Sequence, residues 1–256
     1  MKLLIDAGNS RTKWAWCPSA DEEASWQVHA LENAQWFAVG GEAELLRQAV
    51  LEADEVWVSN VAGELWLRGL PAMVKSLHVI QAEGSALGLK NHYSHPAQLG
   101  SDRWCSLLSA WRQFTQSALV VTAGTAMTID ALLVNNHEAD FLGGSIQPGL
   151  RLMWQSLQQG AAQLDYSYAE GIAWQDFALN SQQAMWLGCV KALTAPIVMQ
   201  YARLSEQVGT PPLLLLSGGD AQLLRRYLSH ALSAQAIIVD NLVLKGLACL
   251  ARNSDK

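Results

Sequence analysis

The 256-residue sequence is poor in cysteine, and its cysteines form no recognisable pair. The four lie far apart in the chain, at Cys17, Cys105, Cys189 and Cys249. No two of them have the C-x-x-C spacing that is typical of zinc and redox sites. The sequence therefore predicts reduced thiols, as is usual for a cytoplasmic protein.

Charged residues are also scarce, at 16% of the chain, and lysine and arginine form no basic block. With a net charge of −6, sequence-independent binding of nucleic acid is disfavoured. No apolar run reaches the roughly 18 to 20 residues that cross a membrane. The apolar stretch before Asp6 is too short for a signal peptide. We therefore expect a cytoplasmic protein with neither a nucleic-acid nor a membrane partner.

What the sequence does contain is an alternation of apolar and amphipathic segments. The apolar segments predict strands at 3–8, 55–61, 77–82, 118–133, 213–219 and 236–240. The amphipathic segments predict helices at 43–52, 104–114, 150–159, 182–207 and 242–252. Such an alternation is typical of an α/β protein with largely buried sheets.

Two of the predicted strands begin with similar sequences. LLIDAGNSRT at 3–12 aligns with LVVTAGTAMT at 119–128, so that the shared Ala-Gly recurs 116 residues later. This repeat predicts two domains, 1–115 and 116–256, with the final helix able to pack back on the first. Each domain would present a polar loop at a strand end, and two opposed loops could hold a polyphosphate. Glycine in such loops lets backbone N–H groups approach phosphate closely.

The first loop combines one carboxylate with small polar groups and two cations. Asp6 at a strand end beside glycine suits a Mg²⁺ ion that carries a nucleotide phosphate. Lys13 or Arg11 could neutralise charge on the phosphate oxygens. The same residues are also ordinary chemistry for a solvated hairpin turn, and the loop alone does not decide between the two.

A second polar cluster, GSDRW at 100–104, stands where a helix is predicted to begin. Asp102 could accept a proton from a substrate hydroxyl while Arg103 holds an anionic group, which is what phosphoryl transfer to an alcohol needs. Alternatively, Ser101 or Asp102 could simply cap the helix.

Two glycine-rich segments, GGSIQPGL at 143–150 and LSGGDA at 216–221, follow in the second half. A Gly-Gly at a strand end would let a flat ring such as adenine lie against the backbone, but such turns are common without a ligand. Neither the Walker A pattern nor G-x-G-x-x-G after a strand is present, so any nucleotide is held by other loops.

Taken in order along nearly the whole chain, these motifs resemble the type III pantothenate kinase family. The resemblance is carried by D-A-G-N-S at 6–10, G-S-D-R at 100–103, A-G-T-A-M-T-I-D at 123–130, G-G-S-I-Q-P-G at 143–149, N-S at 180–181, S-G-G-D at 217–220 and N-L-V-L-K-G-L at 241–247. It implies two ribonuclease-H-like domains of the acetate and sugar kinase, heat-shock 70 and actin superfamily, with a nucleotide cleft between them. It also implies ATP-dependent phosphorylation of pantothenate to 4′-phosphopantothenate, the first step of coenzyme A biosynthesis.

The resemblance also implies roles for individual residues. ATP would be bound by Asp6, Ala7, Gly8, Asn9, Ser10, Arg11, Thr12, Lys13, Gly124 and Thr125. Pantothenate would be bound by Tyr93, Gly100, Ser101, Asp102, Arg103 and Ser181. Asp102 would be the catalytic proton acceptor, and Asp6 would lie near the Mg²⁺ of ATP. The family is implied to work as a homodimer and to use a monovalent cation, potassium or ammonium.

The sequence departs from the family pattern at two of these places. Where the family usually has an aspartate that helps to coordinate the monovalent cation, this chain has Thr122, which brings an oxygen but no charge. We therefore expect potassium activation to be weakened or relocated. Ser181 replaces a threonine and keeps the hydroxyl.

Two other functions stay open at this point. One is a kinase of the same fold that acts on another small hydroxylated acid or sugar. The other is a non-catalytic, nucleotide-binding regulator or transcriptional accessory protein, although the presence of both Asp6 and Asp102 favours catalysis.

Overall fold

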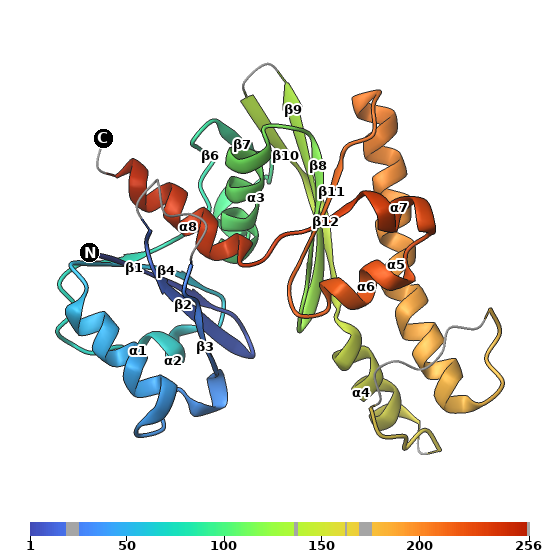
Figure 1. Ribbon diagram of the computed structural model, residues 1–256, viewed down its shortest axis with the longest axis horizontal. Helices are drawn as coiled ribbons and strands as arrows, with labels where there is room; N and C mark the ends of the chain where they lie inside the picture. Colours follow the sequence, from blue (N-terminus) through green and yellow to red (C-terminus); the bar gives the residue numbers. More distant parts are fainter. Residues whose placement is uncertain (19–25, 136–137, 162, 169–175, 255–256) are drawn as a thin grey trace. The chain divides into compact units, whose positions relative to one another are not determined.

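The computed structural model describes residues 1–18, 26–135, 138–161, 163–168 and 176–254 (Figure 1). Contacts between residues divide the chain into two compact units. The first comprises Met1–Thr115, Val134–Phe141 and Asn241–Lys256, and the second comprises Gln116–Leu133 and Leu142–Asp240. The contiguous domains 1–115 and 116–256 stay a prediction. No helix among the described residues is long and apolar enough to cross a membrane.

The first unit is built on a five-stranded sheet. Its strands are β1 (Lys2–Ala7), β2 (Arg11–Trp16), β3 (His29–Glu32), β4 (Glu55–Asn60) and β5 (Leu77–Val79), in the order β3-β2-β1-β4-β5. Strand β1 pairs with β2 in antiparallel fashion and with β4 in parallel. The predicted strands at 3–8, 55–61 and 77–82 are therefore confirmed as β1, β4 and β5.

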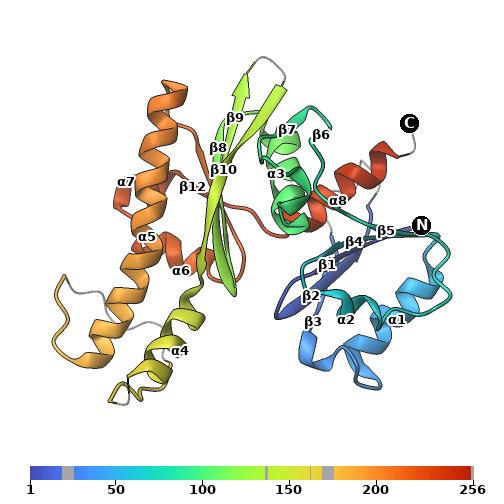
Figure 2. The ribbon, with the colours of Figure 1, turned by 180° about the vertical axis from the view of Figure 1, so that it is seen from behind.

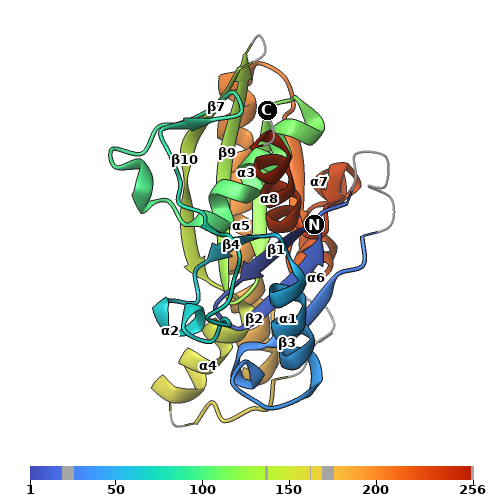
Figure 3. The same cartoon turned by 90° about the vertical axis from the view of Figure 1, so that its left-hand side faces the viewer.

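Helices cover both faces of this sheet, because side chains alternate along each strand. Leu3 and Ile5 of β1 pack in one core with residues of α1 (Gly41–Glu52) and α2 (Glu64–Leu67). Leu4 points to the other face, where α3 (Ser101–Phe114) and α8 (Leu242–Asn253) lie (Figures 1 and 3). Asp6 follows Leu4 by two residues in β1, so its side chain lies on the same face of the sheet, that of α3 and α8.

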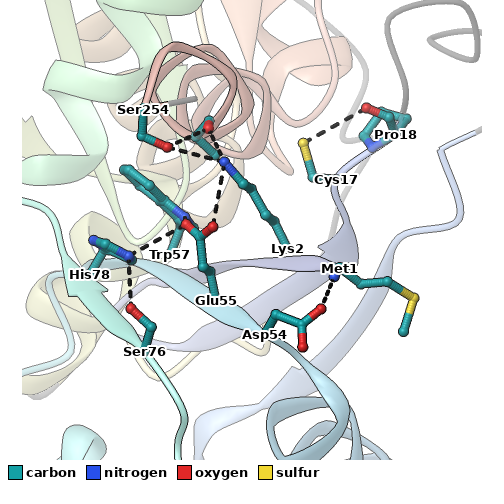
Figure 4. A network of polar contacts seen from close by, with 11 residues as sticks. Met1, Lys2, Cys17, Pro18, Asp54, Glu55, Trp57, Ser76, His78 and Ser254 are labelled. Carbon is teal, nitrogen blue, oxygen red and sulfur yellow. Dashed lines mark hydrogen bonds and ion pairs between the residues drawn. The ribbon is translucent and has the colours of Figure 1, made fainter. Parts of the chain in front are cut away.

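The two helices on that face pack closely against each other. A Cβ atom at Gly246 would lie 1.9 Å from the carbonyl oxygen of Cys105, so only glycine allows this approach of α8 to α3. The end of α8 is fastened to the sheet by Lys2, whose Nζ donates to the carbonyl oxygen of Ala251 at 2.5 Å (Figure 4). A cation is favourable at this end of a helix because it meets free carbonyl groups.

Shorter elements complete the first unit. They are the 3₁₀ helices η2 (Asn33–Gln35) and η3 (Pro96–Gln98) and the strands β6 (Ser85–Ala86) and β7 (Leu89–Asn91). Strand β7 pairs in parallel with the first residues of β10 (Glu138–Pro148), with Leu89 opposite Ala139.

The second unit repeats the strand order of the first. Its strands are β8 (Ala118–Ala123), β9 (Ala126–Asn135), β10, β11 (Leu213–Ser217) and β12 (Ala236–Ile238), in the order β12-β11-β8-β9-β10. Strand β8 pairs with β9 in antiparallel fashion and with β11 in parallel, as β1 does with β2 and β4. The short sequence repeat therefore marks a repeat of the whole sheet topology.

Four helices belong to the described part of the second unit, namely α4 (Leu150–Gly160), α5 (Ser181–Val208), α6 (Ala221–Tyr227) and α7 (His230–Gln235). Trp154 of α4 and Trp186 of α5 pack in one core with Leu119 and Val121 of β8. The long helix α5 runs alongside the sheet of this unit (Figure 2). The side chain of Asn180 caps α5 by accepting a hydrogen bond from the Gln183 N–H at 2.9 Å.

Two expectations about this unit are wrong. The single strand predicted at 118–133 is a hairpin of β8 and β9 that turns at Gly124 and Thr125. Because both arms are apolar, the turn leaves little trace in the hydropathy. The glycine-rich segment at 143–148 is not a loop but the second half of β10, and only Gly149 separates it from α4.

Candidate active site

Asp6 stands near the end of β1 among polar groups of the neighbouring strands. Its Cα is paired with Lys13 on β2 and with Ser59 on β4, so the three side chains share one face of the sheet. The pKa of Asp6 is raised from 3.8 to about 7, chiefly by burial and also by the charge of Asp102, while the charge of Lys13 opposes the shift. Lys13 Nζ also donates to Asn241 Oδ1 at 3.0 Å, just before α8 begins. Asp6 is therefore a carboxylate whose ionisation a nearby cation would favour.

Asp102 is the second residue of α3, and its carboxylate is fixed locally. Its Oδ1 accepts a hydrogen bond from the Arg103 N–H at 2.7 Å. Burial raises the pKa of Asp102, and the Arg103 hydrogen bond and charge partly offset this. Gly100 is the N-cap residue, so no side chain caps the helix from the N-cap position. Because the Asp102 carboxylate accepts a backbone N–H of the first turn, its helix-capping role stays open beside the catalytic one.

The approach of Asp102 to the chain before α3 explains the glycine in GSDRW. A Cβ atom at Gly100 would lie 2.6 Å from Asp102 Oδ1. Any larger residue at position 100 would push the carboxylate aside. Ser101 is anchored to β4, because its Oγ lies 2.9 Å from Ser59 Oγ in a buried contact.

Arg103 is buried, with an exposed fraction of only 5%. Its guanidinium donates to Tyr93 Oη at 2.9 Å and lies 5.7 Å from the ring centres of Tyr93 and Phe141. The aromatic rings and the hydroxyl hold the cation in one orientation. Tyr93 and Arg103, ten residues apart in the sequence, are thus brought into direct contact, as their predicted common role requires.

The loop at 8–10 is a hairpin turn between β1 and β2. The Gly8 N–H donates to the Arg11 carbonyl oxygen at 3.1 Å, so the turn is tight. The turn interpretation is therefore correct, and it does not exclude phosphate binding, because the turn residues Asn9 and Ser10 are exposed. Arg11 forms an exposed ion pair with Glu32 at 2.5 Å. Of the two cations, Lys13 is therefore the one that lies beside Asp6, to which it is paired across the strands.

One residue that sequence reasoning missed, Asn33, holds this turn in place. Its Nδ2 donates to the carbonyl oxygens of Gly8 at 2.6 Å and Asn9 at 3.1 Å. Its backbone N–H donates to the Ser10 carbonyl oxygen at 2.9 Å, and its Oδ1 accepts from Thr12 Oγ1 at 2.8 Å. No motif signals this role, because the contacts join residues more than twenty positions apart.

Two tryptophans extend this network into the core. Trp66 Nε1 donates to Thr12 Oγ1 at 2.9 Å, and Trp36 Nε1 donates to the Trp66 carbonyl oxygen at 2.8 Å. The two indoles are stacked with their ring centres 5.1 Å apart. These tryptophans therefore support the first turn through Thr12.

The second turn, at Gly124 and Thr125, is held by the glycine-rich segments. The Gly149 N–H donates to the Thr125 carbonyl oxygen at 2.9 Å, and a Cβ at Gly149 would lie 2.0 Å from the Gly124 carbonyl oxygen. A Cβ at Gly218, whose φ is +94°, would lie 2.1 Å from the Ala123 carbonyl oxygen. In both segments, a glycine permits close backbone packing on the turn.

Thr122 occupies the position in the second sheet that Asp6 occupies in the first. Its Cα is paired with Thr128 on β9 and with Ser217 on β11, where Asp6 has Lys13 and Ser59. Thr128 Oγ1 is buried and has no hydrogen-bond partner within the described residues. The second hairpin therefore offers hydroxyl groups where the first offers opposite charges.

The remaining predicted residue, Ser181, is the exposed first residue of α5 and belongs to the second unit. The predicted pantothenate residues Tyr93 and 100–103 belong to the first unit, as do the ATP-binding residues 6–13. Gly124 and Thr125 lie in the second unit.

Comparison with known proteins identifies the family. A family model for type III pantothenate kinase matches residues 2–203. The chain belongs to the type III pantothenate kinase family. A type III pantothenate kinase from Laribacter hongkongensis is 39% identical over 254 residues, covering 99% of this chain and all of the relative. A type III pantothenate kinase from Chromobacterium violaceum is also 39% identical, and the alignment covers 98% of this chain and 99% of the relative.

Solved structures with lower identity show the fold of this pantothenate kinase family member. A proposed Baf family transcriptional activator from Campylobacter jejuni has a TM-score of 0.59 at 19% identity and covers 99% of this chain and 98% of its own. A proposed 2-dehydro-3-deoxygalactonokinase from Sinorhizobium meliloti has a TM-score of 0.57 at 15% identity, with 99% of both chains covered. An archaeal actin homolog has a TM-score of 0.51 at 11% identity, again over 99% of both. These likenesses confirm the predicted class of two ribonuclease-H-like folds.

Proposed function

We propose that the protein transfers the γ-phosphoryl group of ATP to the primary hydroxyl of pantothenate. Family membership supports this reaction, and one observation links the reaction to particular residues. Asp6 and Asp102 come from different elements of the first unit, yet the charge of Asp102 raises the pKa of Asp6. Two interacting carboxylates, one for the metal–nucleotide and one for the acceptor hydroxyl, are what phosphoryl transfer to an alcohol requires.

Asp102 is the proton acceptor in this proposal. A general base works best when its pKa is closer to the working pH than that of a free carboxylate, and burial shifts the pKa of Asp102 in this direction. Gly100 leaves room for the carboxylate, and the Arg103 N–H orients it. The Arg103 guanidinium, fixed by Tyr93, would pair with the carboxylate of pantothenate.

ATP would be held by backbone groups of the two turns and by Lys13. Within the described residues, no group of three or more His, Cys, Asp or Glu side chains is placed to hold a metal ion alone. A kinase needs no such group, because Mg²⁺ is usually held by one or two carboxylates and the substrate phosphates. Asp6 fits this role, since its raised pKa indicates a site that a cation would stabilise. When bound with ATP, Mg²⁺ would neutralise charge on the phosphates.

The residues around Thr122 do not fit a tightly bound monovalent cation. Thr122, Thr128 and Ser217 supply neutral hydroxyls, whereas cations of this kind are held more firmly where a carboxylate contributes. We therefore keep the proposal that potassium or ammonium activates this protein weakly or at another place.

A homodimer is a further part of the proposal. Phe177 and Leu179 are exposed to 84% and 83%, immediately before Asn180 and Ser181. A second subunit that covers these side chains would also reach Ser181. Light scattering of the purified protein would give the mass of the particle directly. The cytoplasmic location also stays a prediction.

A coupled kinase assay with pantothenate tests the main proposal. Asp102→Asn should fold and bind ATP like the wild type but lose about 10²- to 10⁴-fold in turnover, the usual contribution of a general base. A variant of this kind with full turnover would refute the role of Asp102. A panel of hydroxylated acids and sugars in the same assay separates pantothenate from other acceptors.

The second candidate is a nucleotide-binding regulator, and Thr122 is the observation that favours it, because it replaces a charged residue of the family pattern. If the wild-type protein binds ATP but phosphorylates neither pantothenate nor any acceptor of the panel, the regulator is the better account.

A further inference from the structure

A cavity of about 530 Å³ lies beside the helix pair α3 and α8 in the first unit. It is lined near the end of α3 by Arg112 and along α8 by Lys245 and Arg252. Asp102, by contrast, stands at the beginning of α3, ten residues or about 15 Å of helix before Arg112. None of the residues that line the cavity belongs to the site described above, although Lys245 lies one helical turn after Asn241. The volume of the cavity falls in the range of about 300 to 1,000 Å³ usual for ligand sites.

The charge of the cavity lining is strongly one-sided. Three of its side chains are cationic, and among the described residues neither Asp nor Glu lines it, although the whole chain has a net charge of −6. Within the described part of the chain, the side chains of Arg112 and Lys245 make no hydrogen bond or ion pair. Two cations that share a cavity, with no anion among the described residues that line it, repel each other, and a bound anion would remove this cost.

The position of Lys245 strengthens this inference. Arg112 and Arg252 lie in the last turns of their helices, where a cation is favourable in itself. Lys245 is the fourth residue of α8, close to the positive end of the helix, where a cation is unfavourable. The side chain of Lys245 is also only partly exposed to solvent. Neither the helix nor a described neighbour explains this lysine, whereas an anion in the cavity would.

The remaining lining indicates what the anion carries. Trp26, Leu87 and Ala248 supply an indole and aliphatic surface beside the cations. Arginine recognises phosphate through paired N–H donors, and an indole face accepts a flat or apolar group. We propose that this cavity binds an organic phosphate monoester, with the phosphate between Arg112 and Lys245 and the organic part against Trp26.

Such a ligand would act on the two helices that carry the candidate active site. Asp102 stands in the first turn of α3, and Asn241, which receives the hydrogen bond from Lys13, immediately precedes α8. The helices touch where Gly246 meets Cys105, so a ligand that contacts both Arg112 of α3 and Lys245 of α8 would join the two helices of one packed pair. The binding site itself does not depend on the proposed kinase activity.

Isothermal titration with simple probes tests the proposal on the full chain. Phenyl phosphate carries both parts of the proposed ligand, inorganic phosphate carries only the charge, and phenol only the ring. Phenyl phosphate should bind more tightly than either fragment, and its affinity should fall with added salt. Arg112→Gln and Lys245→Gln should each weaken its binding at least about tenfold, the usual loss for a hydrogen bond to a charged group.

Two control variants locate the binding. Arg203→Gln removes an exposed cation of α5 and should leave the affinity unchanged. Lys13→Gln alters the candidate ATP site and should also leave it unchanged. The proposal is wrong if phenyl phosphate does not bind at millimolar concentration. It is equally wrong if Lys13→Gln weakens binding while Arg112→Gln and Lys245→Gln do not.

Discussion

Replacing Asp6 by asparagine should stabilise the ligand-free protein at neutral pH, although it removes a residue proposed for catalysis. Burial and the charge of Asp102 raise the pKa of Asp6 from 3.8 to about 7. At about 1.4 kcal/mol per pKa unit, this shift lowers the unfolding free energy by roughly 4 kcal/mol when the pH is above 7. An uncharged amide at this position would carry no such cost, and a gain of even half this size is large against a total stability of about 5 to 15 kcal/mol.

The sign of the pH dependence follows from which state binds the proton more tightly. The folded wild type holds the Asp6 proton up to about pH 7, whereas the unfolded chain releases it near 3.8. The wild type therefore loses unfolding free energy as the pH rises from about 4 to about 7 and levels off above that range. The variant does not titrate at this position, so its advantage should be small near pH 4 and largest above pH 7. The attraction of Asp6 to Lys13 is already included in this pKa, because the charge of Lys13 opposes the upward shift.

Urea unfolding at several pH values between about 5 and 8, without nucleotide or Mg²⁺, measures this difference. Asp54→Asn is the matched control. The N-terminal amine and Lys75 lower the pKa of the exposed Asp54 to about 2, so its charge stabilises the folded state at every pH of the series. That variant should be slightly destabilised by a constant amount. The reasoning is refuted if the advantage of Asp6→Asn is independent of pH, or if the variant is less stable than the wild type at pH 8.

Three further predictions concern the turns. Asn33→Asp keeps the acceptor for Thr12 but loses the donors to the first turn, so the KM for ATP should rise about tenfold while that for pantothenate stays unchanged, as steady-state kinetics would show. Gly149→Ala places a Cβ 2.0 Å from a carbonyl oxygen of the second turn and should lower the melting temperature by several degrees, whereas Gly160→Ala, with open space around it, should not. Thr122→Asp restores a carboxylate, so titration with potassium should reveal an activation stronger than that of the wild type.

The sequence predicts the secondary structure well where apolar segments are bounded by polar ones. The predicted strand at 55–61 and the predicted helices at 43–52 and 182–207 are confirmed as β4, α1 and α5. It fails at 118–133, because Leu119 and Val120 are both buried on opposite faces of β8. When both arms of a hairpin are covered on both faces, the turn between them is the only polar interruption, and two residues do not suffice to mark it.

The candidate site divides in a similar way. The motifs locate Asp6 and Asp102, and the strand register then explains why Lys13 and Ser59 accompany Asp6. Asn33 could not be predicted, because its four hydrogen bonds to the turn arise only when β3 is laid beside β2. Sequence patterns record periodicity and local turns, whereas support of this kind depends on which strands become neighbours.

The repeated topology allows the two hairpins to be compared position by position, and the comparison separates two kinds of chemistry. The first hairpin places Asp6 opposite Lys13, and burial and the charge of Asp102 raise the pKa of Asp6 even though the charge of Lys13 opposes the shift. The second places Thr122 opposite Thr128, with no charge, and its turn is held by close glycine contacts instead. A backbone fixed by such contacts presents N–H groups at little further cost in entropy, which suits phosphate. The two units therefore repeat one strand order with different side chains. In the proposed function, the first hairpin would hold the metal–nucleotide and the second would supply neutral contacts to phosphate.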